Sequence, residues 1–370
     1  MNTLSGNVLT PDGWYAGSVH FTDRISAIEG SPGTTAGEAD CYILPGFIDL
    51  HVHGGGGRDV MEGGDALQTI ARQHARHGTT SLLATTMTAP RSDIELALEG
   101  IGQVMTTRPS GTSRVLGVHL EGPFINPGKL GAQPNFARDG MLEEIEAFNA
   151  IAPIRTLTMA PEIKGHQDLI RYLAHRGIRI QLGHTLGSYE DGVAAMKLGA
   201  TSFTHLFNAM TGLHHREPGI TGAALAHAEF AELIPDLLHV HPGAIHTALR
   251  AIPKLYCVTD STAAAGMPDG QYKLGSHTVT KCLGGVRLPD GTLAGSTLTM
   301  DEALRNLVSI GLEIDDASRR LSTYAADYLG LAERGRLCAG AWADMVVLDR
   351  NLRIKEVWIE GERLEHIDAP

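Results

Sequence analysis

The sequence predicts an α/β fold in which eight parallel strands close into a barrel of the TIM type, with a small β domain built from both ends of the chain. Two observations lead to this prediction. Short apolar or β-rich segments alternate with helical stretches along the middle of the chain, and short strands broken by Gly, Pro and Asp occupy both ends. Alternating strands and helices are typical of a parallel sheet, and eight such units favour a closed barrel.

Eight candidate strands follow one another in the middle of the chain. They are GFIDLHVH (46–53), TTSLLATTMT (79–88), VLGVHLEGPF (115–124), RTLTMAPE (155–162), IRIQLGHT (178–185), TSFTHLFN (201–208), ELIPDLLHV (232–240) and LYCVTDST (255–262). Helices are expected between most of them, for example over 66–77, 93–107, 167–175 and 189–198. An open doubly wound sheet is the alternative, but its G-x-G-x-x-G fingerprint is missing, although the glycines at 54–57 superficially resemble it.

The two ends of the chain share a different pattern. WYAGSVHFT and RISAIEG near the N-terminus, and ADMVVLD and RIKEVWIEG near the C-terminus, have the composition of short strands. We expect them to pair into one β-sandwich domain made of residues 1–44 and 336–370, next to a barrel domain over 45–335. Two unrelated peripheral hairpins are the alternative.

Composition narrows the classes of partner and compartment. The 370 residues carry a net charge of −12 with no basic block, so a nucleic-acid partner is not expected. Four cysteines, at 41, 257, 282 and 338, form no C-x-x-C pair, and this spacing predicts neither a disulfide framework nor a cysteine zinc site. The N-terminus has no signal-peptide pattern and the chain has no 18-residue apolar run, so we expect a cytoplasmic protein without a membrane partner.

The predicted strand ends carry the side chains that bind metals. In a barrel of this type the active site lies at the carboxyl ends of the strands. Five of the predicted strands end there in a histidine or a carboxylate: His51 and His53, Glu121, His184, His205 and Asp260. His51 and His53 are two residues apart in a strand and therefore share one face, and the four glycines after them allow close approach. These ligand types suit zinc, iron, manganese or cobalt, so the sequence predicts a divalent metal site.

Metal-activated water is the chemistry that this pattern favours. There is no G-x-S-x-G elbow and no H-E-x-x-H helix. Asp260, beside the predicted metal, is the candidate to take a proton from water and to pass it to a leaving group.

Other polar residues remain open at this stage. Arg216, in the loop NAMTGLHHREPG (208–219), could hold a phosphate or a carboxylate, or it could be a solvated loop residue. His239 and His241 share a strand face near the end of the seventh strand and could touch a substrate, although a structural role is equally open for His241. We interpret the remaining histidines of helical and polar segments as surface residues; they are His74, His77, His166, His175 and His227.

Several motifs together resemble a known family. PGFIDLHVHGGGG, HLEGPFINP, LGHT, THLFNAMTGLHHREPG, VTDSTAAAGMPDG and GTLAGSTLTM occur in order over nearly the whole chain. They resemble the N-acetylglucosamine-6-phosphate deacetylases of the amidohydrolase superfamily. The resemblance implies a homodimeric, metal-dependent hydrolase of amino sugar metabolism, with zinc as the expected metal. Such an enzyme converts N-acetylglucosamine 6-phosphate to glucosamine 6-phosphate and acetate. N-acetylgalactosamine 6-phosphate is the close alternative substrate; a cyclic-amide hydrolase and a binding protein are more distant alternatives.

The resemblance also implies roles for individual residues. Glu121, His184 and His205 resemble ligands of a main metal, and His51 and His53 with Asp260 resemble a second site, so that one or two metals bind and Glu121 could bridge them. Asp260 resembles the general base and acid. Residues that resemble substrate contacts are Ala132, Gln133, Asn208, Ala209, Arg216, which can reach across a dimer interface, His239, Leu293, Ala294 and Gly295.

Two features of the sequence qualify the resemblance. The family usually has a histidine in the loop after the EGPF strand, where it polarises the acetyl carbonyl, and here KLGAQPNF places Gln133. An amide can donate a neutral hydrogen bond but carries no proton. Cyclic-amide hydrolases often bridge two metals with a modified lysine on the fourth strand. Here that strand ends in Pro161 and Glu162, and Lys164 lies beyond it, which speaks against that alternative.

Overall fold

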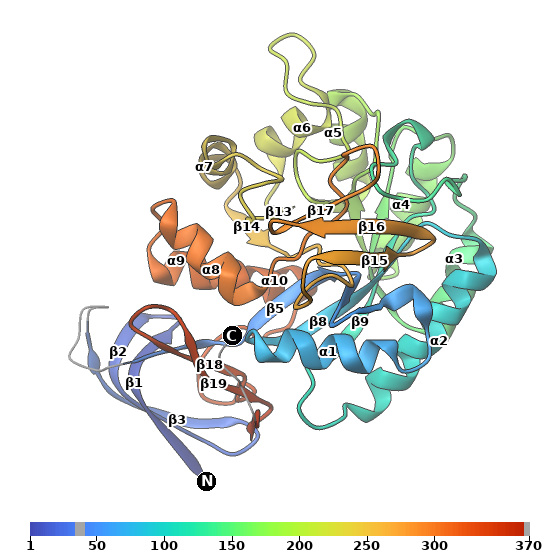
Figure 1. The fold of residues 1–370 in the computed structure, drawn as a ribbon. Coiled ribbons are helices and arrows are strands. Elements are labelled where there is room, and N and C mark those ends of the chain that lie inside the picture. Colours follow the sequence, from blue (N-terminus) through green and yellow to red (C-terminus); the bar gives the residue numbers. More distant parts are fainter. Residues whose placement is uncertain (34–40, 366–370) are drawn as a thin grey trace.

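The computed structural model describes residues 1–33 and 41–365, and its central feature is a barrel of eight parallel strands (Figure 1). The strands are β5 (Phe47–Val52), β8 (Thr79–Thr86), β9 (Arg114–Glu121), β10 (Ile154–Met159), β11 (Arg179–Leu182), β12 (Ala200–Phe203), β13 (Phe230–Leu233) and β14 (Lys254–Cys257). Six of them form one sheet in the order β12-β11-β10-β9-β8-β5, and β13 pairs with β14. All eight predicted barrel strands are therefore present.

Backbone hydrogen bonds just beyond the strand ends close the ring. Between β12 and β13, the Leu206 N–H donates to the Glu232 carbonyl at 2.9 Å. Between β14 and β5, the Asp260 N–H donates to the His51 carbonyl at 2.9 Å, and Val52 pairs with Ser261 in parallel. The closed barrel that the alternating pattern predicts is thus confirmed.

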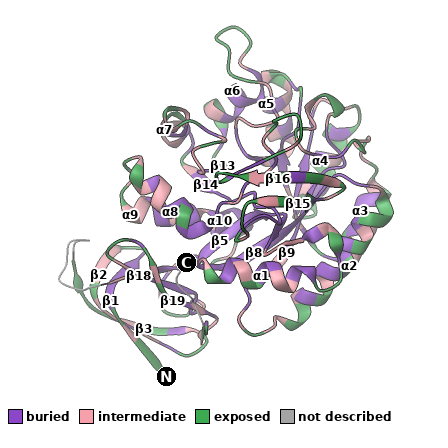
Figure 2. Ribbon diagram, in the orientation of Figure 1, coloured by how far each residue is buried: buried purple, intermediate pink, exposed green. Residues whose placement is uncertain are grey.

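Helices surround the barrel and bury its strands. The four helices that the sequence analysis named are present as α1 (Ala66–Arg76), α2 (Arg91–Thr107), α4 (His166–His175) and α5 (Tyr189–Leu198). The others are α3 (Leu142–Ile151), α6 (Gly219–His227), α7 (Pro242–Ala251), α8 (Met300–Ser309), α9 (Ile314–Leu321) and α10 (Thr323–Leu329). Figure 2 shows the barrel strands almost entirely buried, and every residue of β8 is buried. Parallel strands covered on both faces have this character.

Strands from both ends of the chain form one seven-stranded sheet. They are β1 (Asn2–Thr10), β2 (Gly13–Phe21), β3 (Ile25–Pro32), β4 (Cys41–Pro45), β18 (Met345–Asp349), β19 (Ile354–Ile359) and β20 (Glu362–Arg363), in the order β20-β19-β18-β4-β1-β2-β3. The antiparallel pairing of β18 with β4 joins the two ends, as expected. The sheet curls over its own core, because Phe21 and Trp358, on strands that are not neighbours, meet with ring centroids 4.9 Å apart. The domain limits 1–44 with 336–370 and 45–335 remain our proposal.

A three-stranded antiparallel sheet that the sequence did not predict lies over the carboxyl ends of the barrel strands (Figure 1). It consists of β15 (Gly270–Leu274), β16 (His277–Cys282) and β17 (Gly285–Arg287). Leu274, Val279 and Val286 form a small buried cluster there with Met87 and Ala294. Shorter elements near the same end are β6 (Gly54–Gly55), β7 (Arg58–Asp59) and the 3-10 turns η1 (Val60–Glu62) and η2 (Pro127–Lys129).

Two histidines predicted at the surface are buried instead. His74 on α1 lies with Nε2 3.0 Å from the Gly54 carbonyl and 3.1 Å from Ser261 Oγ, and burial lowers its pKa to about 4. On α4, His166 Nδ1 lies 2.7 Å from the Ala160 carbonyl. Both rings lie on the inner faces of their helices and hydrogen-bond to backbone carbonyls of neighbouring loops. The polarity of the residues alone did not indicate this burial.

The other three histidines in that prediction differ in exposure. His175 and His227 are exposed, as predicted, whereas His77 is half-buried and lies 3.1 Å from Asp301. Among the helices of the described ranges, none has the length and apolar character needed to cross a membrane.

Candidate metal centre

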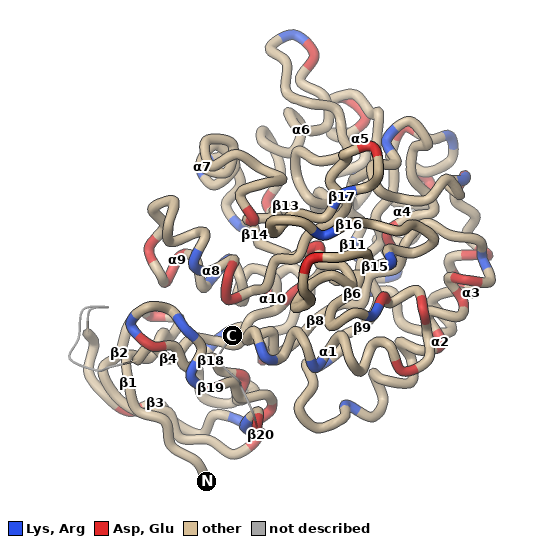
Figure 3. Tube along the Cα trace, in the orientation of Figure 1, with Lys and Arg blue, Asp and Glu red and all other residues tan. Residues whose placement is uncertain are grey.

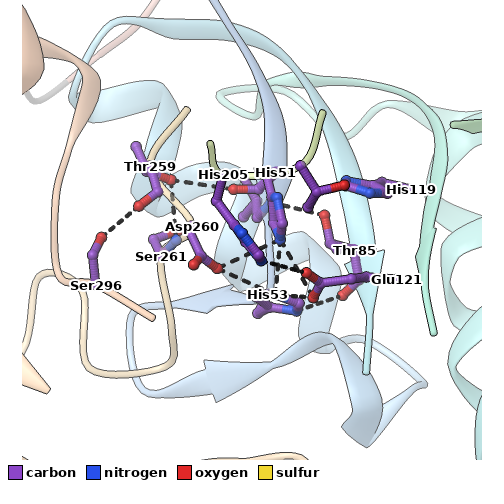
Figure 4. A network of polar contacts seen from close by, with 12 residues as sticks. His51, His53, Thr85, His119, Glu121, His205, Thr259, Asp260, Ser261 and Ser296 are labelled. Carbon is purple, nitrogen blue, oxygen red and sulfur yellow. Dashed lines mark hydrogen bonds and ion pairs between the residues drawn. The ribbon is translucent and has the colours of Figure 1, made fainter. Parts of the chain in front are cut away.

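The six residues predicted as metal ligands converge at the carboxyl end of the barrel. Figure 4 shows the side chains of His51, His53, Glu121, His205 and Asp260 directed toward one another. All six side chains, His184 included, are buried. They form two groups that we name by their members: the first half-site is Glu121, His184 and His205, and the second half-site is His51, His53 and Asp260.

The Glu121 carboxylate lies between the two half-sites. Its Oε1 is 3.0 Å from His184 Nε2 and 3.1 Å from His205 Nε2. Its Oε2 is 3.1 Å from His53 Nε2 and 3.5 Å from His51 Nε2. Because each oxygen faces a different half-site, the geometry is that of a carboxylate able to bridge two cations.

Three of the six residues have left-handed backbone conformations. The φ angles of His184, His205 and Asp260 are 48°, 28° and 49°. They lie shortly beyond β11, β12 and β14, which end at Leu182, Phe203 and Cys257. This conformation is uncommon outside glycine and costs about 1–3 kcal/mol per residue. Such a cost persists when the surrounding structure enforces it, and it is often found at functional sites.

The tautomers of two rings show that the donor set fits a metal. His184 Nδ1 lies 2.8 Å from the Lys129 carbonyl, and His53 Nδ1 lies 3.2 Å from the Thr85 carbonyl. A carbonyl only accepts, so Nδ1 carries the hydrogen and, in the neutral ring, Nε2 presents a lone pair to the centre. Nitrogen and carboxylate ligands in this arrangement suit a divalent transition metal.

The pKa shifts at the centre show that its carboxylates favour positive charge close to them. Burial disfavours a charged His53, but hydrogen bonds to Asp260 and Glu121 outweigh burial and raise its pKa to about 9. Burial likewise opposes ionisation of Glu121, yet His51, His184 and His205 hold its pKa well below the usual value. The carboxylates thus attract protons or, equally, cations to this point.

A cavity of about 220 Å³ opens over the centre. The predicted substrate residues that line it are Ala132, Gln133, Asn208, Ala209, His239, Leu293 and Gly295. Ala294 lies behind this wall in the small cluster under β15–β17. Met87, Leu274 and Thr292 also line the cavity and were not predicted; of these, Leu274 belongs to β15 of the unpredicted covering sheet.

Gln133 is fixed at the edge of the metal centre. It is 5% exposed, its Oε1 accepts from the Thr88 N–H at 2.7 Å, and its Nε2 donates to Glu121 Oε2 at 2.6 Å. The Thr88 bond sets the orientation of the amide, so its donor end faces the carboxylate and the cavity.

The prediction that His239 and His241 share a strand face is wrong, because β13 ends at Leu233 and both residues lie in the segment that leads to α7. His239 Nδ1 lies 2.6 Å from Asp236 Oδ2; burial opposes protonation, but Asp236 outweighs it and raises the pKa of His239. His241 is instead exposed and caps α7, accepting from the Gly243 N–H.

Arg216 does not reach the cavity of its own chain. It is exposed on the loop between β12 and α6, which extends away from the body of the molecule (Figure 1), and its Nη1 lies 2.8 Å from His215 Nε2. Figure 3 shows basic and acidic residues side by side at the tip of this loop.

Residues 42–364 match the family model described as Amidohydrolase family. The chain belongs to the amidohydrolase family. The N-acetylgalactosamine-6-phosphate deacetylase of Escherichia coli O157:H7 is 39% identical over 96% of this amidohydrolase and 97% of its own length. The N-acetylglucosamine-6-phosphate deacetylase of Vibrio furnissii is 38% identical over 94% of this chain and 91% of its own.

Solved structures of related amidohydrolases have the same fold. The N-acetylglucosamine-6-phosphate deacetylase of Thermotoga maritima superposes with a TM-score of 0.90 at 33% identity, covering 98% of this chain and 99% of its own. A variant of the Mycobacterium smegmatis deacetylase, in complex with N-acetyl-D-glucosamine 6-phosphate, gives a TM-score of 0.89 at 34% identity, covering 97% and 98%.

The fourth strand of this amidohydrolase supplies no bridging lysine. Lys164 is exposed beyond the end of β10, as the sequence indicated. Glu121, on β9, is the carboxylate that lies between the two half-sites.

Proposed function

We propose that this amidohydrolase removes the acetyl group of N-acetylglucosamine 6-phosphate and releases glucosamine 6-phosphate and acetate. The observation that carries the proposal is full-length similarity, in sequence and fold, to a deacetylase solved with that phosphosugar. The paired half-sites beneath an open cavity supply the matching chemistry.

One or two divalent metals are held, in this proposal, by the two half-sites. When bound, a cation there lowers the pKa of water and polarises the acetyl carbonyl. Zinc suits the histidine and carboxylate donors, and iron, manganese and cobalt are alternatives.

Asp260 moves the proton. Its Oδ1 lies 3.3 Å from His53 Nε2 and 3.5 Å from His51 Nε2, at the floor of the cavity. As the water oxygen bonds to the acetyl carbon, Asp260 takes the water proton, and as the C–N bond breaks it gives that proton to the sugar nitrogen. Acetic acid and a free amine result, and the acid then loses its proton to give acetate.

Gln133 stabilises the acetyl oxygen. Its amide is anchored by Thr88, and its Nε2 already lies at the metal centre, 2.6 Å from Glu121 Oε2. In this proposal the second N–H of the same nitrogen donates to the oxygen that becomes negative during attack.

The phosphate needs positive charge that the cavity lacks. No Lys or Arg is among the described residues that line it, and His239 is the candidate cation within the chain. We therefore propose that Arg216 enters the cavity of a second copy and binds the phosphate there. Four exposed leucines on loops near the carboxyl ends of the strands, at 186, 213, 238 and 283, provide apolar surface for such a homodimer.

N-acetylgalactosamine 6-phosphate is the second candidate substrate. The Escherichia coli relative named for that sugar is 39% identical over nearly the whole chain, so overall similarity does not separate the two epimers. We also propose that the reaction takes place in the cytoplasm, where no partner beyond the phosphosugar and the second copy is required.

The test is acetate release by purified protein of known metal content. N-acetylglucosamine 6-phosphate, N-acetylgalactosamine 6-phosphate and unphosphorylated N-acetylglucosamine are compared. We expect turnover that requires the 6-phosphate, and the ratio of the two epimers then names the substrate. No acetate from either phosphosugar at full metal occupancy contradicts the proposal.

A further inference from the structure

A buried glutamate on β13, Glu232, lies directly behind the metal centre. Its side chain is 0% exposed. It is not one of the six proposed ligands and does not line the cavity, but with His51 and His119 it forms a third buried group whose ligand atoms lie within 4.8 Å of one another. A fully buried carboxylate is costly unless its surroundings compensate it, so its partners are informative.

The hydrogen-bond partners of the Glu232 carboxylate, including the Tyr256 hydroxyl at 3.5 Å, all act as donors. Its Oε2 lies 3.0 Å from His51 Nδ1 and 3.2 Å from the His205 N–H, and its Oε1 accepts from Gln181 Nε2 at 2.9 Å. The Gln181 amide is itself oriented, because its Oε1 accepts from Thr204 Oγ1 at 3.0 Å. A carboxylate needs no proton in such a setting, and His51 must carry its hydrogen on Nδ1.

This contact distinguishes His51 from the other histidines of the centre. His53 and His184 place Nδ1 against backbone carbonyls, and His205 Nδ1 has no hydrogen-bond partner. Only His51, of these four, has a carboxylate behind it. A carboxylate fixes the ring orientation and makes Nε2 a stronger donor to a cation.

The same Glu232 oxygen contacts both half-sites. Through His51 it reaches the second half-site, and through the His205 backbone it reaches the first. The φ of His205 is 28°, so a fixed acceptor for its N–H helps to hold a backbone conformation that the residue does not favour.

We propose that Glu232 is a positioning residue of the metal centre: it sets the tautomer of His51, strengthens Nε2 of that ring as a ligand, and holds the His205 main chain in place. This inference rests on the proposed metal centre but not on the identity of the substrate. Among the contacts of the described residues, Glu232 has no Lys or Arg partner, so the positive charge opposite it must come through His51.

The experiment measures metal affinity directly. Glu232→Gln keeps the shape and removes the charge, Glu232→Asp keeps the charge and shortens the side chain, and Glu144→Gln is a control. Glu144 is a buried glutamate of α3, and it pairs with Arg138 at 2.6 Å away from the centre. Affinity for Zn²⁺ and Co²⁺ is measured by competition with a chromophoric chelator, and thermal unfolding of each metal-free protein reports folding.

We expect E232Q to bind metal about 10–100-fold more weakly, E232D to fall between it and the unaltered protein, and E144Q to bind normally. Unchanged affinity in E232Q overturns the inference. Weaker binding by E232D than by E232Q also overturns it, because that order reports packing rather than charge.

A second measurement serves if metal-free E232Q does not fold. Nitrogen NMR of the metal-loaded, unaltered protein should show His51 protonated at Nδ1 and not at Nε2; the opposite tautomer overturns the inference. None of these readouts uses the sugar. Absence of acetate release would contradict the proposed function but not this inference. Wild-type metal affinity in E232Q would contradict this inference even if the protein is an active deacetylase.

Discussion

The two ends of strand β9 carry two clusters of charged and ionisable side chains, one buried and one partly exposed, that differ in kind. At its carboxyl end, Glu121 meets histidines and Asp260 at the metal centre. At its first residue, Arg114 belongs to a seam cluster that joins the barrel to the C-terminal strands; its members are Arg108, Arg114, Arg334, Asp344, Glu360 and Glu362.

The seam cluster is balanced within itself, whereas the metal centre is not. Three arginines face three carboxylates at the seam, and Arg114 Nη2 lies 2.6 Å from Glu360 Oε2. Arginine is a permanent cation, so these pairs need nothing further. A histidine ring that gives its Nε2 lone pair to a cation is neutral, so in the metal-bound state the carboxylates of the centre are compensated by the cation and not by their histidine neighbours. The seam cluster should therefore contribute mainly to stability, and the metal centre mainly to catalysis.

The largest loss of turnover is expected at the metal centre. Asp260→Asn removes the group that moves the proton, and kcat should fall by about 10²–10⁴-fold. Stability should fall modestly, because burial opposes ionisation of Asp260 but its pairs with His51 and His53 outweigh burial and hold its pKa below the usual value. Acetate release and thermal unfolding are measured on samples of matched metal content. A kcat within tenfold of the unaltered enzyme would show that Asp260 does not carry the proton.

The next largest loss is expected at Gln133. Gln133→Ala removes the proposed donor to the acetyl oxygen, and kcat should fall by about 10²–10³-fold. Thr292→Ala, elsewhere on the cavity wall, is the control and should change kcat only slightly. Gln133→His tests whether an ionisable donor works in this position. An unimpaired Gln133→Ala enzyme would remove Gln133 from the mechanism.

Arg216→Ala should act on binding rather than on turnover. Loss of a charge-assisted hydrogen bond to phosphate is worth about 1.5–3 kcal/mol, which corresponds to a KM about 10–100-fold higher with kcat nearly unchanged. Lys164→Ala, another exposed cation, should have no effect.

Mixed dimers show which subunit supplies this arginine. When Arg216→Ala and Asp260→Asn subunits are combined, one of the two sites regains both an intact Asp260 and an intact Arg216, provided that the arginine crosses the interface. Activity at low substrate should then rise above that of either variant alone. No recovery in verified mixed dimers would place Arg216 outside the partner's site.

The smallest effect on turnover, and the clearest effect on stability, is expected at the seam. Burial opposes ionisation of Glu360, but Arg114 and Arg334 outweigh it and lower its pKa from the ordinary 4.5 to about 2. This difference contributes about 2–3 kcal/mol of stability. The contribution is complete above pH 4.5 and is lost as the pH falls toward 2, because the unfolded state binds the proton first.

Glu360→Gln should therefore destabilise the protein at pH 7, and the difference from the unaltered protein should shrink as the pH falls below 4.5. Denaturant unfolding at several pH values measures it. Glu356→Gln, which removes the exposed pair with Arg363, should cost little. A kcat loss in Glu360→Gln comparable to that of Asp260→Asn would end the distinction between the two clusters.

The same contrast explains what the sequence could reveal. The six proposed ligands were predictable because barrel strands bring their carboxyl ends together and residues i and i+2 share a face, as His51 and His53 do. The pairing of the two chain ends followed from composition. Neither inference required knowledge of packing.

Residues whose role depends on packing escaped prediction. Glu232 opens a predicted strand, but only the folded barrel shows that its carboxylate is buried behind His51. His74 and His166 look like ordinary helical histidines until the loops beneath them are placed. The sheet β15–β17 follows a motif that marked only Asp260, so its cover over the cavity appears in three dimensions alone.

The most direct test of the central claim is acetate release from N-acetylglucosamine 6-phosphate and its galacto epimer by protein stripped with a chelator and then reloaded with zinc. We predict that the stripped protein stays folded and inactive, and that zinc restores turnover of at least one of the two phosphosugars. Full turnover without metal, or none with metal restored, would contradict the account.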